Sequence, residues 1–126
     1  MNELLSLSEK VIKALRKFGC YIFESRELEK VRDLAIKAEI NKFVEIKPVD
    51  ERYPHIFAMI VARRGIEREC IARVESMLSR GELSQSEYKR YKRELLEQCI
   101  VSLEKERVKE VIAALEKHSS MISRAV

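Results

Sequence analysis

The 126-residue sequence has no tryptophan and no threonine, and it contains only three glycines, two prolines and three cysteines. So few glycines and prolines exclude a collagen-like or low-complexity chain, and three cysteines are too few for a disulfide scaffold. The longest apolar run covers residues 56–62, far short of the roughly 20 residues that a membrane-spanning helix needs. No apolar core with a small-residue cleavage site follows the N-terminus, so we expect a cytoplasmic protein with no membrane partner.

Charge is abundant and balanced. Charged residues make up 37% of the chain, while asparagine and glutamine occur twice each. Abundant Glu, Lys and Arg with few thermolabile amides is typical of proteins from hyperthermophiles, in which ion-pair networks become more favourable on heating. The net charge of +4 is spread over both halves of the chain, which permits attraction to nucleic acid but does not predict it.

The N-terminal half predicts two helices separated by a short strand. A capping box at Ser6 and Glu9 predicts the start of the first helix, which Leu4 and Leu5 could extend backwards, and Gly19 predicts its end. Residues 20–23 are β-prone. Ser25 is the expected cap of a second helix with an apolar stripe through residues 28–38, and Asn41 is its expected stop.

Two strands follow, over residues 43–49 and 55–62, joined by a polar hairpin loop between Pro48 and Pro54. The second strand is apolar almost throughout. We therefore expect both of its faces to be covered, with the strand at the centre of the sheet or under a helix.

The remaining sequence is helical by its apolar spacing. A helix through residues 66–78 should end at Gly81, and a second capping box, Ser84 to Glu87, should open a helix reaching about Lys117. Polar residues 104–107 interrupt its apolar stripe. Because no glycine or proline lies there, we expect an unbroken helix that packs against another subunit.

Residues 71–96 carry a helix, a glycine-containing turn, a capping box, an aromatic residue, a lysine and a leucine pair: Leu78-Ser79-Arg80-Gly81-Glu82-Leu83-Ser84-Gln85-Ser86-Glu87-Tyr88, Lys92, Leu95-Leu96. This segment resembles the SHOCT domain, a short helical hairpin. The resemblance implies an interaction or oligomerisation module without catalytic residues. The same features also occur in unrelated helical hairpins, and this chain continues some 30 residues beyond Leu96.

The order helix, short strand, helix, two-stranded hairpin and long helix in residues 1–80 resembles winged-helix regulators of the MarR or PadR kind. One helix of that layout is missing before the hairpin. The resemblance implies that the helix over residues 26–39 would enter the major groove of DNA and that residues 43–62 would form the wing.

We therefore expect a mainly α fold with a small β-sheet (α+β). A winged-helix-like unit is predicted over residues 1–64 with its β-hairpin at 43–62, and a helical hairpin with a long C-terminal helix over residues 65–126.

Basic side chains on the second helix, on the β-hairpin and in the dense run 89–93 are the candidates for phosphate contacts, with Tyr88 and Tyr91 available to stack on bases. The candidate nucleic-acid-binding residues are Arg26, Lys30, Lys37, Lys47, Arg52, Lys89, Arg90, Lys92 and Arg93. Solvated helix faces with local ion pairs would explain the same charges. Apolar residues of the last helix are the candidate dimer or partner interface: Tyr91, Leu95, Ile100, Leu103, Val108, Val111, Ile112 and Leu115.

Catalytic chemistry has little support. Glu45 and Lys47 share a strand face, as in many metal-dependent nucleases, but no further acidic residue is placed to complete a magnesium site. We expect no enzyme activity, no metal and no cofactor.

Cys20, Cys70 and Cys99 are expected to be buried small hydrophobes. Counted from Gly81, Cys99 should lie ~9 Å too far along the hairpin to bridge to Cys70. A disulfide across a dimer remains open.

Two functions remain. The first is a homodimeric DNA-binding or regulatory protein that dimerises through its C-terminal helices. The second is a scaffold or assembly protein whose helical hairpin binds another protein, without nucleic acid.

Overall fold

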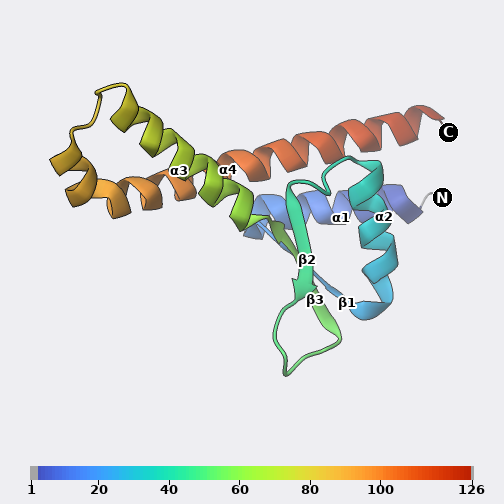
Figure 1. Ribbon diagram of the computed structural model, residues 1–126. Helices are drawn as coiled ribbons and strands as arrows, with labels where there is room; N and C mark the ends of the chain where they lie inside the picture. Colours follow the sequence, from blue (N-terminus) through green and yellow to red (C-terminus); the bar gives the residue numbers. More distant parts are fainter. Residues whose placement is uncertain (1–2, 126) are drawn as a thin grey trace. The chain divides into compact units, whose positions relative to one another are not determined.

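The computed structural model describes residues 3–125 and is mainly helical, with one small antiparallel sheet (Figure 1). This confirms the expected α+β class. The elements are α1 (Glu3–Phe18), β1 (Tyr21–Glu24), the 3-10 turn η1 (Ser25–Glu27), α2 (Leu28–Lys37), β2 (Val44–Pro48), β3 (Ile56–Val61), α3 (Arg63–Ser79) and α4 (Gln85–Ala125). Within the described residues, no helix is long and apolar enough to cross a membrane.

The chain forms two compact units. Unit 1 contains the residues up to Ala62 together with those from Arg107 onward, and unit 2 contains Arg63–Glu106. The sequence predicted a boundary after residue 64, which placed the C-terminal part of α4 in the same unit as the hairpin. The structure assigns that part to unit 1, because Val111 and Leu115 are fully buried in its core.

The core of unit 1 is built by α1, α2, one face of the sheet and the C-terminal part of α4. Leu7, Val11 and Leu15 recur at intervals of four along α1, so they line one side of the helix and pack inward. Ser6 does not begin α1, since the helix already includes Glu3, and the backward extension through Leu4 and Leu5 is confirmed. Leu4 packs against the core, and this contact favours the longer helix.

Both ends of α2 differ from prediction. Neither η1 nor α2 has a side-chain cap, so Ser25 does not cap the helix. Its backbone N–H instead donates to the carbonyl of His55 at 2.7 Å. At the other end Glu39, not Asn41, adopts the left-handed conformation, with φ of 59°. This turn lets the fully buried Ile40 reach the core.

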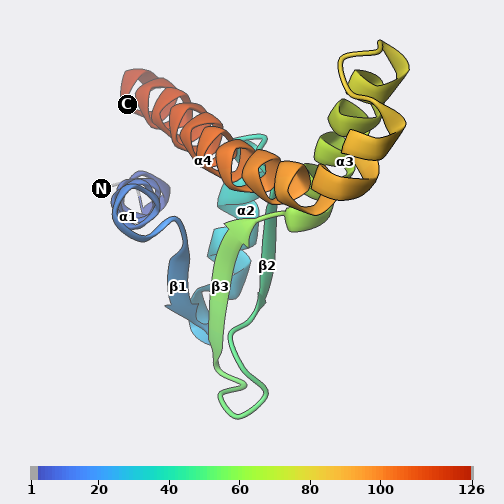
Figure 2. The same cartoon turned by 90° about the vertical axis from the view of Figure 1, so that its left-hand side faces the viewer.

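The sheet has the strand order β1-β3-β2, so the apolar β3 lies at its centre as predicted. Tyr21, Phe23 and Met59 point into the core that the helices cover. Figure 2 shows α2 behind the sheet and no helix of unit 1 in front of it among the described residues. On the other face Ile56 and Ile60 are partly buried, and Ala58 between them is 9% exposed. The prediction that both faces of β3 are covered is wrong, because the helices of unit 1 cover a single face.

Unit 2 is a helical hairpin. Ile66, Cys70 and Val74 are the buried stripe of α3. Ser84 and Glu87 form the predicted capping box: the Glu87 N–H donates to Ser84 Oγ at 3.2 Å, and the Ser84 N–H donates to Glu87 Oε1 at 3.1 Å. The helix that they open is unbroken across residues 104–107, as expected, and reaches Ala125.

Cys70 and Cys99 form a disulfide within the hairpin, with their Cα atoms 5.7 Å apart. The prediction that they lie out of reach is wrong, because it treated the turn as a tight reversal between level, parallel helices. In the structure the connection after α3 leads the chain away from that helix before α4 begins, and α4 then returns toward it (Figures 1 and 2). More residues of α4 are therefore needed to come level with Cys70 than a tight turn would require, and Cys99 is the residue that lies beside it.

Candidate interaction surfaces

Metal-ligating side chains do not cluster in the described part of the chain. Within the described residues, no group of three or more His, Cys, Asp or Glu side chains is placed to hold a metal ion. Glu45 and Lys47 do share one face of β2, since they are two residues apart on a strand. No acidic residue of the described part joins Glu45 in such a group.

The basic candidates around α2 are already paired with acids of this chain. Arg26 Nε lies 3.0 Å from Glu24 Oε2. Lys37 Nζ lies 3.1 Å from Oδ2 of Asp33, which is one helical turn earlier. These side chains are more than half exposed, so each pair contributes little to stability and could open for a ligand.

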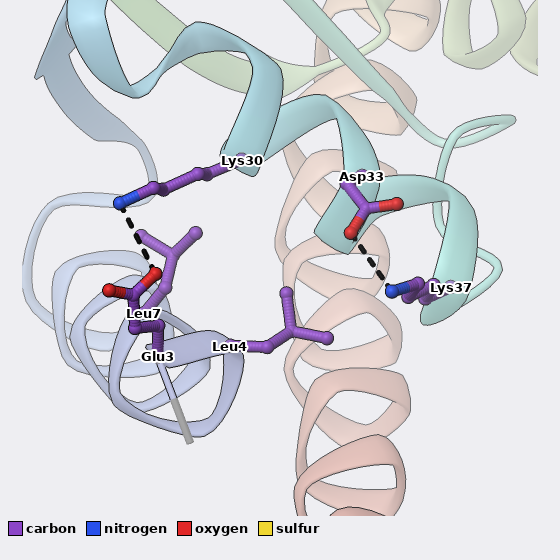
Figure 3. A pocket seen from close by; sticks show the side chains of 6 residues that line it. All are labelled: Glu3, Leu4, Leu7, Lys30, Asp33 and Lys37. Atoms are coloured by element: carbon purple, nitrogen blue, oxygen red, sulfur yellow. Dashed lines mark ion pairs between the residues drawn. The ribbon is translucent and has the colours of Figure 1, made fainter. Parts of the chain in front are cut away.

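The third basic candidate, Lys30, lines a cleft between α1 and α2 of about 340 Å³. In Figure 3 it reaches from α2 to Glu3 of α1, and the two charged atoms are 3.4 Å apart. Leu4 and Leu7 point into the space between the helices. The cleft also contains the Lys37–Asp33 pair, so its charges cancel. It offers no excess of one sign for an anionic or cationic ligand.

The hairpin loop between β2 and β3 is also neutralised locally. Asp50 accepts hydrogen bonds from the Arg52 guanidinium, at 2.9 Å for the closest pair, and from the Arg52 backbone N–H. These bonds hold the pKa of the Asp50 carboxyl below its ordinary value. Lys47 is exposed and makes no ion pair within the described residues.

The net charge of the predicted DNA-reading region determines how well it can bind phosphates. Residues 25–55 contain seven basic and seven acidic side chains. Non-specific affinity for DNA comes mainly from neutralising phosphates with an excess of Lys and Arg. This region has no such excess.

The basic run on α4 contacts the two tyrosines next to it. The Arg90 guanidinium lies 5.4 Å from the ring centre of Tyr91, and Lys92 Nζ lies 5.2 Å from that of Tyr88. Arg93 forms an ion pair with Glu97, with Nε 3.4 Å from Oε1. Lys89 is exposed. The cations thus lie over the rings on which a base would have to stack.

The predicted dimer interface on α4 is divided between the two units. Val111 and Leu115 are fully buried in unit 1, where Val108 and Ile112 pack against the same core. Leu103, in unit 2, is 3% exposed. Leu103, Val111 and Leu115 are covered by the chain itself and are not accessible to a second subunit, whereas Val108 and Ile112 keep part of their surface.

In unit 2, three of the predicted interface residues keep accessible surface. Tyr91 is 38% exposed, and Leu95 and Ile100 are partly exposed. With Tyr88, also partly exposed, Tyr91 and Leu95 recur at intervals of three and four along α4 and therefore share one side of the helix. We call Tyr88, Tyr91 and Leu95 the tyrosine face.

A buried polar contact escaped sequence analysis. Ser8 of α1 is fully buried, and its Oγ lies 2.7 Å from Ser119 Oγ on α4. Nearby in the sequence, Arg16 pairs with Glu116. The two pairs join segments about a hundred residues apart, and no local pattern marks such partners. Ser8 and Ser119 satisfy each other's hydroxyls, so we interpret this contact as structural.

The described surfaces thus comprise regions in which acidic and basic side chains balance one another, a helical hairpin joined by a disulfide, and the tyrosine face. Comparisons with protein-family models, with curated proteins and with solved structures find no match to this chain.

Proposed function

We propose that the protein is a non-enzymatic assembly protein that binds a protein partner through its α3–α4 hairpin. The observation that carries the proposal is the tyrosine face, an accessible apolar strip on a hairpin whose two helices are covalently joined. Tyr and Arg, together with Trp, are enriched among the residues that dominate protein–protein binding energy. Here Arg90 lies beside Tyr91 on the helix that carries this strip.

The disulfide supports this function by preorganisation. A rigid hairpin loses less conformational freedom on binding than a flexible one, which leaves more of the interaction energy for affinity. The resemblance of residues 71–96 to SHOCT domains points to the same class of function. Four basic residues at positions 89–93 flank the tyrosine face, so the expected partner surface is apolar with acidic residues around it.

The test begins with capture of a partner from an extract of the source cells, followed by its identification and purification. Binding is then measured by calorimetry for the wild type, Tyr91→Glu and Val101→Glu. Val101 is the matched control, because it is 54% exposed on the same helix but lies outside the tyrosine face. We expect Tyr91→Glu to weaken binding at least tenfold and Val101→Glu to leave it unchanged.

Failure of the wild type to capture a partner, or equal affinities for the three proteins, would reject the hairpin as the binding site. Circular dichroism of each variant separates loss of binding from loss of folding.

A second candidate, DNA binding, is favoured by one observation. Unit 1 has the helix, strand, helix and hairpin order of a winged-helix-like layout, and its first strand joins the far strand of the hairpin. The neutral charge of residues 25–55 opposes this function. Fluorescence anisotropy of labelled random duplex DNA at low and moderate salt distinguishes the two candidates.

For an assembly protein we expect no micromolar, salt-sensitive binding of DNA. If such binding occurs and Arg26→Ala/Lys30→Ala/Lys37→Ala reduces both its affinity and its salt dependence, DNA binding replaces the assembly function.

A further inference from the structure

The face of the sheet opposite the core is an apolar surface in unit 1. Paired residues of an antiparallel sheet point to the same side, so the register defines this face. Ile22 and Lys47 both pair with Ala58, Glu24 pairs with Ile56, and Glu45 pairs with Ile60. Val49 continues the row of Ile56, because its N–H donates to the Ile56 carbonyl. We call this set the open sheet face.

Its exposure is unusual for apolar side chains. Ile22 is 59% exposed and Val49 is 50% exposed, and Ile56 and Ile60 are partly exposed, whereas Ala58 at the centre is 9% exposed. A sheet face with an isoleucine and alanine centre normally packs against another layer. The described residues of unit 1 place their helices on the other side of the sheet (Figure 2).

The charges at the two edges of this face are complementary to each other. Glu24 lies on the β1 edge and Lys47 lies on the β2 edge, one row of paired residues apart. Two copies related by a twofold axis parallel to the strands would stack β1 of one copy over β2 of the other. Each Lys47 would then lie diagonally opposite the partner subunit's Glu24, with its stem against the partner subunit's Ile22. Glu24 also pairs with Arg26 of its own chain, and because both side chains are exposed, this pair can open or share the carboxylate with Lys47.

We infer that the open sheet face binds a second copy of this chain, forming a symmetric dimer of two stacked sheets. Stacked sheets pack about 10 Å apart, a distance that a Lys and a Glu side chain can span together. A twofold axis uses the same surface on both copies, which a self-complementary face satisfies.

The dimer should be weak. Stable protein interfaces bury about 800 Å² on each partner, and a face of three short strands is smaller. We therefore expect reversible dimerisation in the micromolar range. The inference does not rest on the hairpin function, because all of its residues belong to unit 1.

The first test is sedimentation of the full-length protein over a range of concentrations, in a Cys20→Ser background that removes the free thiol. Ile22→Asp should raise the dimer dissociation constant at least about tenfold, because the buried isoleucine is lost and a charge replaces it. Ile36→Asp is the matched control: Ile36 is 63% exposed on α2, away from the sheet, and its substitution should have no effect.

A charge swap tests the proposed geometry. Lys47→Glu should weaken dimerisation several-fold by placing two acids together, and Glu24→Lys combined with Lys47→Glu should restore it. A protein that stays monomeric at all concentrations overturns the inference. Dimerisation that survives Ile22→Asp but is lost with Tyr91→Glu also overturns it, by assigning the contact to the hairpin.

Discussion

Ser84 illustrates how one hydroxyl organises a turn. It accepts a hydrogen bond from the Glu87 N–H, and the Glu87 carboxylate accepts one from the Ser84 N–H. Two donors at the start of α4 are thereby satisfied, although neither residue is buried. Hydrogen bonds from the Ser84 side chain and backbone lower the pKa of Glu87 below its ordinary value of 4.5.

Replacing this hydroxyl should destabilise the start of α4. We expect Ser84→Ala to lower the free energy of unfolding of the hairpin by about 1 kcal/mol, the usual loss for an N-cap. Thermal unfolding followed by circular dichroism measures it. Ser102→Ala is the control, since Ser102 is an exposed serine in the interior of α4, away from the start of the helix.

The effect of Ser84→Ala should depend on pH. Because the folded-state pKa of Glu87 is depressed, the carboxylate stabilises the fold fully above its unfolded pKa of 4.5, and this contribution is lost as pH falls through the lower folded value. The difference between wild type and Ser84→Ala should therefore be larger at pH 7 than in acid. An equal difference at both pH values would show that the Ser84 hydroxyl does not contribute to the lowered pKa of Glu87.

At the scale of elements, the hairpin of unit 2 has a thin core. Two helices can bury only one stripe each, here Ile66, Cys70 and Val74 on α3, with Leu103 on α4. A unit of this size rarely gains enough from apolar burial alone, and small units commonly depend on cross-links. The disulfide closes a loop of 29 residues and restricts the unfolded hairpin.

Reduction of the disulfide should loosen unit 2 selectively. By the loop-entropy estimate the cross-link contributes roughly 3–4 kcal/mol. Amide hydrogen exchange with and without a phosphine reductant should show faster exchange in residues 63–106, whereas α1 and α2 should change little. Uniform protection in both states would mean that packing, and not the cross-link, holds the hairpin.

At the scale of the molecule, the two ends of the sequence share one core. Val11 and Leu15 of α1 belong to the same buried cluster as Val111 and Leu115 of α4. The Arg107 guanidinium adds a contact 4.9 Å from the ring centre of Phe43. Unit 1 therefore cannot complete its core without the C-terminal part of α4.

Leu115→Ala should destabilise unit 1 by about 2–5 kcal/mol, because Leu115 is fully buried and the change leaves a cavity. Met121→Ala on the same helix is the control: Met121 is 59% exposed, and surface changes usually stay within about 0.5 kcal/mol. Chemical denaturation measures both. A loss for Leu115→Ala no larger than that of the control would show that α4 does not complete the core.

Local patterns were sufficient for most elements. The apolar spacing of α1 and α3, the Ser84–Glu87 cap and the central position of β3 could all be predicted, because each depends on residues a few positions apart or on the hydropathy of one strand. The end of α1 at Gly19 was predicted as well, but the start of α1 and both ends of α2 could not be. Leu4 and Ile40 extend or redirect the chain to reach a core that more distant segments create.

The sequence by itself determined the fold class, the order of elements and the neutral charge of residues 25–55, because propensity, periodicity and charge are local properties. Only the tertiary structure decided that Val111 and Leu115 face the chain's own core, that Cys70 meets Cys99 and that the sheet keeps an open face. Each of these depends on how whole elements pack on one another, and the apolar stripe of a helix is the same whichever surface covers it.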